Sequence, residues 1–255
     1  MGTLRIERRG DLALVRLDKA RGNAIDSPLV EDLLAAARDL GSDTGVRGVL
    51  LASAHPRLFS PGLDLVTLST YDRPALQAFM RRFAEVVRAL YALPRPMVAA
   101  VSGHAVAGGC ILALTADWRV LARGARMGLN EVKVGLPLPW SVALLVRASA
   151  APQALSRVAL LGRNASDEEA LATGLADELA DADGFEEACL ARLTEFAEKD
   201  PTAVATTKRY LRASVLASME AHEEAHLAEF LDAWFSPGTQ ERLRGIVSSL
   251  RGPGR

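Results

Sequence analysis

A glycine turn and a carboxylate further along the chain are the residues best suited to chemistry. Gly108 and Gly109 separate two apolar runs, at 96–101 and 111–116. Glycine lets the backbone turn sharply, and the unpaired N–H groups that begin the following helix carry partial positive charge. We therefore expect this turn to bind an anionic oxygen, with Glu131 as the carboxylate that follows it.

The residues around Glu131 are almost all apolar. They are Leu129, Val132, Val134, Leu136, Pro137, Leu138 and Trp140. Such neighbours predict a desolvated carboxylate, and desolvation raises the pKa because it disfavours the charged form. A carboxylate with a raised pKa is a stronger base and a usable acid near neutral pH. Asn130 is a candidate either to orient this base or to bridge to the backbone.

Apolar periodicity and turn residues predict the elements that position these groups. In chain order we expect strands at 4–8 and 12–17, a helix from 27 to 41, a strand at 46–53, a helix at 74–93, a strand at 96–101 and a buried helix at 111–116. The first two strands form a hairpin around Gly10 and Asp11. Ser27 is expected to cap the first helix, Pro28 to occupy its first turn and Gly41 to stop it. This order indicates α/β layering.

Beyond Trp140 the sequence predicts helices almost throughout. They are expected at 142–148, 152–161, 167–173, 185–199, 202–216, 219–235 and 239–250. No hinge rich in serine and proline interrupts the chain, and no repeat indicates a solenoid. We therefore expect a core over 1–200 and a C-terminal helical region over 201–255, packed on that core or on a neighbouring subunit. The apolar residues Leu227, Phe230, Leu231, Trp234 and Phe235 suit either partner.

Composition excludes several classes of function. The 255 residues carry 30 basic and 31 acidic side chains, a net charge of −1, so no electrostatic footprint indicates nucleic acid or an anionic membrane. No apolar run approaches the roughly 20 residues of a membrane span, and the N-terminus lacks the apolar core of a signal peptide. We expect a cytoplasmic protein with no nucleic-acid or membrane partner. Cys110 and Cys189 are expected to be reduced and buried.

Three segments together resemble the crotonase (enoyl-CoA hydratase/isomerase) superfamily. They are LDKARGNAID at 17–26, LFSPGLDL at 58–65 and RPMVAAVSGHAVAGGCILALTADWRV at 95–120. The segment GLNEVKVGLPLPW at 128–140 looks most like the Δ3,Δ2-enoyl-CoA isomerase branch. The resemblance implies a spiral of β-β-α repeats with C-terminal helices that build a homotrimer or a hexamer. It also implies an acyl-CoA substrate, with CoA as part of the substrate and no further cofactor or metal.

The resemblance assigns roles to backbone groups and to one loop. The N–H groups of Leu63 and Gly108 correspond to the pair that binds the thioester oxygen in the family and stabilises an enolate. One such donor typically contributes about 2.7–4 kcal/mol to lowering the barrier. Lys19, Arg21 and Ala24 fall in the segment that resembles the family's CoA contacts.

The resemblance also shows a departure from the hydratase pattern. Hydratases use two glutamates to hold and deliver water; the second corresponds to Glu131, whereas Ile111 stands where the first would be. Because an isoleucine can neither orient water nor transfer a proton, one base remains. Glu131 alone suits a double-bond shift, in which it takes a proton from C2 of a 3-enoyl-CoA and returns it at C4.

Alternatives from other classes remain open on the sequence. Other crotonase reactions are hydration with a substitute water holder, thioester hydrolysis and decarboxylation, because one fold hosts many chemistries. A catalytically idle CoA-binding or scaffold protein is a second class. His222 to His226 match H-E-x-x-H, the pattern of a zinc-hydrolase helix, but the stretch is highly charged and no obvious third ligand follows.

Three further residues have both a functional and a structural interpretation. His104 lies beside the glycine turn and either lines the pocket or is a hydrogen-bonded structural histidine. Asp64 and Asp117 each follow a functional segment, and we expect them to cap turns or to pair with arginines such as Arg119.

Overall fold

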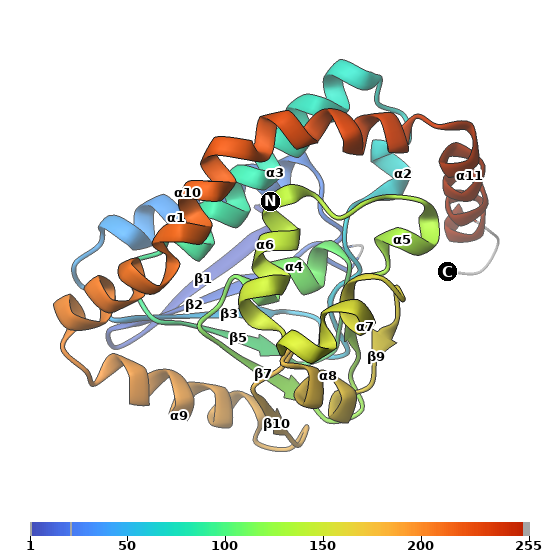
Figure 1. Ribbon diagram of the computed structural model, residues 1–255. Helices are drawn as coiled ribbons and strands as arrows, with labels where there is room; N and C mark the ends of the chain where they lie inside the picture. The colour runs from blue at the N-terminus through green and yellow to red at the C-terminus, as the bar shows by residue number, and fades with distance from the viewer. Residues whose placement is uncertain (1, 21, 252–255) are drawn as a thin grey trace.

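A computed structural model describes residues 2–20 and 22–251 and has a six-stranded sheet at its centre (Figure 1). The strands lie in the order β1 (Leu4–Arg9), β2 (Leu12–Leu17), β3 (Gly48–Ser53), β5 (Met97–Val101), β7 (Trp118–Ala122) and β10 (Glu178–Ala180). Within this sheet of the described residues, β1 and β2 alone pair antiparallel, through the expected hairpin, and Gly10 turns it with a φ of 61°. β3 and β5 are buried along their whole length, as continuous apolar runs in a parallel sheet predict.

A second, four-stranded sheet is built from very short strands. They are β4 (Leu58–Ser60), β6 (His104–Val106), β8 (Met127–Gly128) and β9 (Asn164–Ala165). β4 follows β3, β6 follows β5 and β8 follows β7, and each pair of strands leads into a helix. This repeating β-β-α order confirms the expected α/β crotonase-like architecture.

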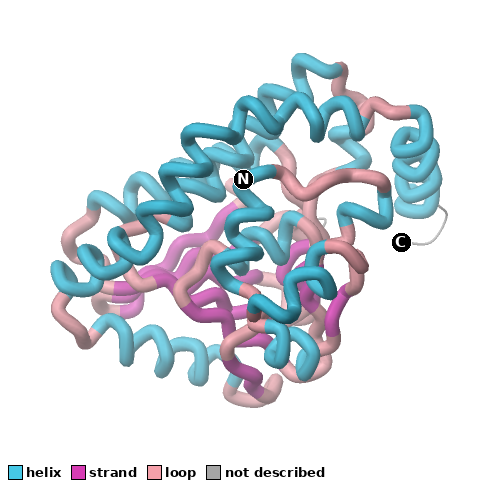
Figure 2. Tube along the Cα trace, in the orientation of Figure 1, coloured by secondary structure: helices cyan, strands magenta, loops and turns pink. Residues whose placement is uncertain are grey.

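Helices surround the two sheets (Figure 2). They are α1 (Ser27–Ser42), α2 (Leu65–Leu68), α3 (Arg73–Tyr91), α4 (Gly108–Leu114), α5 (Glu131–Val134), α6 (Trp140–Ser149), the 3-10 turn η1 (Pro152–Ala154), α7 (Leu155–Ala159), α8 (Asp167–Thr173), α9 (Phe185–Ala197), α10 (Pro201–Trp234) and α11 (Pro237–Arg251). Figure 1 shows α9 along one side of the large sheet and α1, α3 and α10 along the other. No helix among the described residues has the length and apolar character to cross a membrane.

Some helix boundaries differ from those expected. Asp26, not Ser27, caps α1, because the Asp26 carboxylate accepts the Leu29 N–H, and the helix continues past Gly41 to Ser42. The helices expected at 202–216 and 219–235 are one helix of 34 residues. No glycine or proline stands between the two expected segments, so nothing in the sequence breaks the helix there.

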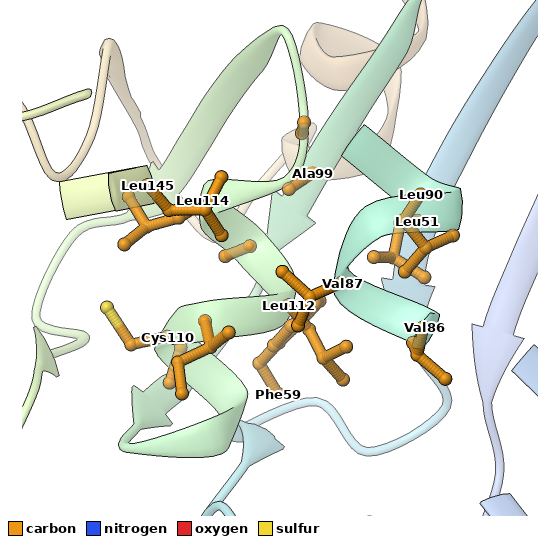
Figure 3. Close-up of a cluster of buried hydrophobic side chains, with 14 of the residues drawn as sticks. Leu51, Phe59, Val86, Val87, Leu90, Ala99, Cys110, Leu112, Leu114 and Leu145 are labelled. Carbon is orange, nitrogen blue, oxygen red and sulfur yellow. The ribbon is translucent and has the colours of Figure 1, made fainter. Parts of the chain in front are cut away.

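The buried helix α4 lies inside the main hydrophobic cluster (Figure 3). All seven of its residues are buried, and its side chains contact strands, α3 and α6. Figure 3 shows Leu112 directed toward Val87 and Phe59, and Leu114 toward Leu145. Because α4 is buried along its whole length, its N-terminus, which carries Gly108, is held in a fixed position.

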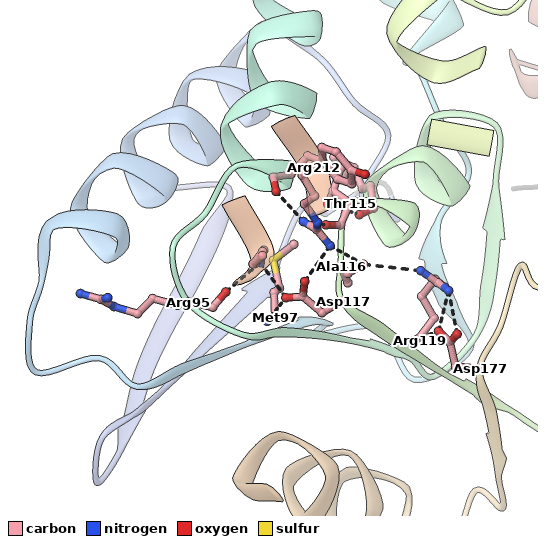
Figure 4. Close-up of polar contacts among 11 residues, drawn as sticks. Arg95, Met97, Thr115, Ala116, Asp117, Arg119, Asp177 and Arg212 are labelled. Atoms are coloured by element: carbon pink, nitrogen blue, oxygen red, sulfur yellow. Dashed lines mark hydrogen bonds and ion pairs between the residues drawn. The ribbon is translucent and has the colours of Figure 1, made fainter. Parts of the chain in front are cut away.

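A buried ion network attaches the first half of α10 to the core (Figure 4). Asp117 accepts from Lys208 at 2.6 Å, from Arg212 at 2.7 Å and from the Met97 N–H at 2.8 Å. Burial lowers the pKa of Lys208 to about 8, although the Asp117 charge opposes this shift. Asp117 pairs with an arginine, as expected, but this arginine is Arg212, whereas Arg119 pairs with Asp177.

The apolar stripe at the end of α10 packs against this same chain. Leu227, Phe230, Leu231 and Trp234 are buried, and Phe235 is partly buried against the core. The stripe therefore gives no indication of a neighbouring subunit, and the expected homotrimer or hexamer stays a prediction.

Candidate active site

A cavity of about 920 Å³ lies where α2, α4, α5, α10 and α11 meet. It collects side chains and backbone from segments far apart in the sequence. Among the residues that line it are Ala24, Leu63, Gly108, Ile111, Asn130 and Glu131. Such a concave, mostly apolar site with a few polar groups is typical of a binding site for a small molecule.

The Leu63 N–H is directed away from the neighbouring backbone by a single β-bridge to Ile25. Ile25 N–H donates to Gly62 O at 2.8 Å, and Asp64 N–H donates to Ile25 O at 2.8 Å. In a parallel bridge the residue between these two contacts turns its own N–H to the opposite side. The Leu63 N–H is therefore directed away from Ile25, and it lies close to Gly108, where an added Cβ would be 3.4 Å from Leu63 N.

Ala107 holds an unusual backbone conformation that orients the Gly108 N–H. Its φ of 48° and ψ of −121° are strained for a residue with a Cβ. The ψ of Ala107 sets the direction of the next peptide group, and hydrogen bonds on both sides hold it: Ala107 N–H donates to Gly128 O, and Ala107 O accepts from Ile111 N–H. The sequence carries no signal of this strain, because an alanine does not predict a positive φ.

Gly109 and Gly108 are glycines for steric reasons. A Cβ on Gly109 would lie 2.2 Å from Ser60 O, and one on Gly108 would lie 2.9 Å from Ile25 Cδ1. The backbone of β4 and the Ile25 side chain, from the loop before α1, therefore pack directly against the turn. Two N–H donors, from Leu63 and Gly108, end close together in the cavity wall, as an oxyanion site requires.

Asn23 joins the two loops behind these donors and was missed by sequence reasoning. It is fully buried with a φ of 62°, and its amide donates to Ser53 Oγ at 2.8 Å and to Phe59 O at 2.9 Å. Ser60 Oγ donates to Asn23 O at 2.8 Å. The signal in the sequence is an asparagine after a glycine, a pair that tolerates the left-handed conformation.

Glu131 projects into the cavity at the N-terminus of α5. Its side chain is buried, with an exposed fraction of 9%, and Oε2 has no hydrogen-bond partner. Burial raises the pKa of Glu131 to about 7, and the backbone N–H groups of Glu131 and Asn130 oppose this in part. The expected desolvation of this carboxylate is confirmed. A carboxyl group with a pKa near 7 exchanges protons readily at neutral pH.

The other residues of the cavity offer little proton-transfer chemistry. Ile111 is 3% exposed and contributes only carbon to the wall. Asp64 also lines the cavity, but its carboxylate caps α2, accepting from Thr67 N–H at 3.1 Å and Thr67 Oγ1 at 2.9 Å. This capping role agrees with the expectation for Asp64.

The loop expected to contact CoA reaches the cavity through its alanines. Ala20 and Ala24 line the cavity. Lys19 Nζ is already bound within the chain, to Asp26 and to Ala24 O, both at 2.6 Å. Arg21, the third residue expected to contact CoA, lies outside the described residues.

Apolar side chains from three helices form a further wall. Met80 and Phe83 come from α3, Phe230 and Trp234 from α10, and Ile246 and Leu250 from α11. Arg251 also lines the cavity, at the end of α11. The structure thus offers an apolar surface beside the donor pair and the buried carboxylate.

The histidines singled out in the sequence have structural contacts. His222 and His226 pack on the Trp140 ring, with centroids 6.0 and 4.3 Å away. Over residues 2–20 and 22–251, no group of three His, Cys, Asp or Glu side chains is arranged to hold a metal ion. His104 is exposed and its Nδ1 accepts from Arg126 N–H at 3.1 Å, as expected of a hydrogen-bonded structural histidine.

Comparison with known proteins agrees with this arrangement. The family model described as enoyl-CoA hydratase/isomerase matches residues 7–241. A putative enoyl-CoA hydratase of Thermus thermophilus is 35% identical over 230 residues, 89% of each chain. The human mitochondrial enoyl-CoA delta isomerase 1 is 25% identical over 242 residues, 94% of this chain and 80% of that one.

A solved structure shows the same fold. The crystal structure of human mitochondrial Δ3-Δ2-enoyl-CoA isomerase superimposes with a TM-score of 0.93, at 24% identity, over 98% of both chains. At this identity the likeness concerns the fold alone. Since the relatives carry both hydratase and isomerase names, the chemistry of the site has to distinguish the two.

Proposed function

The chain belongs to the enoyl-CoA hydratase/isomerase family, and from this we propose that it is an acyl-CoA double-bond isomerase. It converts a 3-enoyl-CoA into the trans-2-enoyl-CoA. The observation that carries the proposal is the pairing of one buried carboxylate, Glu131, with an apolar Ile111 in the same cavity. Adding water across a double bond needs a group that holds the water, whereas moving a proton needs only one base.

The backbone donors supply the electrostatic part of the mechanism. The thioester oxygen binds between the N–H groups of Leu63 and Gly108. When the C2–H bond breaks, negative charge moves onto that oxygen and the two donors stabilise the resulting dienolate. Because the donors belong to the main chain, the leucine at 63 does not disturb this role.

Glu131 supplies the proton transfer. Its carboxylate takes the proton from C2, the double bond moves from C3–C4 to C2–C3, and the same carboxyl group returns the proton to C4. A pKa of about 7 favours both steps, since neither the charged nor the neutral form is strongly preferred at neutral pH. The reaction is redox-neutral and returns its proton, so CoA within the substrate is the one cofactor involved.

The test is the conversion of 3-hexenoyl-CoA to the conjugated thioester, followed by absorbance. Glu131→Gln is expected to lower kcat by about 10²–10⁴-fold, because it removes the base and keeps the shape. Glu241→Gln makes the same change on the exposed face of α11 and is expected to leave kcat unchanged. Unchanged activity in Glu131→Gln contradicts the proposal.

Hydration is the second candidate, because a relative at 35% identity is named a hydratase. Hydration requires a second side chain in place of the missing glutamate to hold the water. Besides Glu131, the acidic and uncharged polar side chains that line the described cavity are those of Asp64 and Asn130. Hydration of crotonyl-CoA is expected to be weak. A turnover comparable with isomerisation would replace the isomerase proposal by the hydratase, and binding without any turnover would indicate a non-catalytic CoA-binding protein.

A further inference from the structure

The second half of α10 holds the first turn of α6 through Glu223. The Glu223 carboxylate accepts from Ser141 N–H at 2.9 Å and from Ser141 Oγ at 3.3 Å. α6 follows Pro139 and has no side-chain cap of its own. The start of a helix leaves N–H groups unpaired and favours negative charge, so this glutamate from a distant helix supplies the cap.

Trp140 makes the second contact between the two helices. Its Nε1 donates to Ser218 O at 3.1 Å. Its ring stacks on His226, with an interplanar angle of 21°, and meets the edge of His222. The H-E-x-x-H pattern of α10 is therefore a docking face, in which two histidines flank a tryptophan and the glutamate between them binds the next residue.

The connection from α6 back to Glu131 is short and stiff. Gly135, at the end of α5, and Leu136-Pro137-Leu138-Pro139 join α5 to α6. Proline fixes its own φ and restricts the residue before it, so the four residues from Leu136 to Pro139 have limited freedom, and Gly135 O accepts from Thr239 Oγ1 of α11 at 3.2 Å. Leu136 N–H donates to Glu131 O at 3.0 Å, and Leu136 and Pro139 line the cavity with Glu131. A displacement of Ser141 is therefore transmitted to Glu131.

We propose that Glu223 is a positioning residue for the base: it holds the segment 131–141 so that the Glu131 carboxylate stays in the cavity and away from water. The role assigned to Glu131 rests on the proposed function. Burial raises the pKa of Glu223, and the groups that oppose this shift are Ser141, Arg88 of α3 and His226.

The kinetic test compares Glu223→Ala with two other variants. A misplacement of about 1 Å lowers rates by about 10²-fold, so kcat is expected to fall by about 10–10²-fold with little change in KM. The inflection of the kcat/KM profile near pH 7 is expected to move to lower pH, because water reaches Glu131. In Glu223→Gln the amide oxygen still accepts from Ser141 N–H, so kcat is expected to recover to within about fivefold of the unmodified protein.

Glu224→Ala is the matched control. Glu224 is the next residue on α10, exposed, and paired with Arg81 at the surface. Its removal is expected to leave kcat and the pH profile unchanged. An equal loss of kcat in Glu224→Ala, or no loss in Glu223→Ala, overturns the proposal.

Amide hydrogen exchange tests the same role without a substrate. In Glu223→Ala the amides of 131–141 are expected to exchange faster, whereas those of α4 keep their rates. Faster exchange confined to Ser141 overturns the proposal. If Glu223→Ala does not fold, His226→Ala serves instead, because it removes the stacking on Trp140. It is expected to speed the exchange of the amides of 131–141. Unchanged exchange rates in His226→Ala overturn the proposal. A wild-type protein with no isomerisation refutes the proposed function, and the exchange rates still decide the role of Glu223.

Discussion

Replacement of Glu131 by glutamine is expected to lower kcat strongly and to stabilise the fold above neutral pH. The carboxyl group has a pKa of about 7 in the folded protein, raised by burial from 4.5. Between these values the folded state holds more protons on this group than the unfolded state. The free energy of unfolding therefore falls as the pH rises from 4.5 to about 7, and above pH 7 it falls no further on account of this group.

The size of this effect follows from the shift. A tenfold change in an equilibrium constant corresponds to about 1.4 kcal/mol, so a rise in the pKa from 4.5 to about 7 costs the folded protein about 3 kcal/mol above pH 7. Glutamine has the same shape and no charge to desolvate. Relative to the unmodified protein, Glu131→Gln is thus expected to gain about 3 kcal/mol of unfolding free energy between pH 4.5 and pH 7, and no more beyond.

Urea unfolding followed by tryptophan fluorescence measures this difference. Both proteins are unfolded at a series of pH values from 5 to 8.5, at one protein concentration, because the stability of any oligomer depends on concentration. Glu241→Gln, at an exposed position of α11, is expected to differ from the unmodified protein by the same small amount at every pH. A constant difference for Glu131→Gln, or one that grows as the pH falls, would refute the reasoning about burial.

Two further outcomes are expected. kcat/KM for isomerisation should rise with pH through about 7, because only the ionised form of Glu131 accepts the C2 proton; a profile that is flat between pH 5.5 and 8.5 would show that another group acts as the base. Gly108→Ala should lower kcat by about 10²–10³-fold, the effect of losing one oxyanion donor, because the added Cβ would lie 3.2 Å from Gly62 Cα and displace the backbone. In the control Gly245→Ala the added Cβ has no atom within 4 Å, so this variant should match the unmodified protein. Equal losses of kcat in both variants would contradict the donor role.

The sequence predicted the large elements because their signals are long. The hairpin, α3 and the buried run of β5 have apolar patterns that match their structures. β4, β6, β7, β8, β9 and β10 were not predicted; all of them except β7 have only two or three residues, which is too short to show a period. They form because neighbouring strands of the spiral lie beside them, which is tertiary information.

The residues of the site could be predicted from the sequence, whereas the contacts that hold them in place could not. Leu63, Gly108 and Glu131 were assigned through motifs, and the structure brings all three to one cavity. Lys19 was assigned in the same way, yet its ammonium is held by Asp26. The strain at Ala107 comes from contacts with β8 across the small sheet, and the local sequence does not encode them.

The strength of Glu131 as a base is a property of where α10 lies. Burying this carboxylate costs about 3 kcal/mol above pH 7, so the segment 131–141 remains closed only if other contacts outweigh that cost. α10 supplies them along its length: Lys208 and Arg212 bind Asp117, Glu223 binds Ser141, and Phe230 and Trp234 close the cavity wall. On the proposed function, loosening the contacts of Glu223, Phe230 or Trp234 is expected to admit water, to lower the pKa of Glu131 toward its ordinary value and to weaken the base. The helix therefore couples the stability of the fold to the chemistry of a residue about 90 positions earlier in the chain.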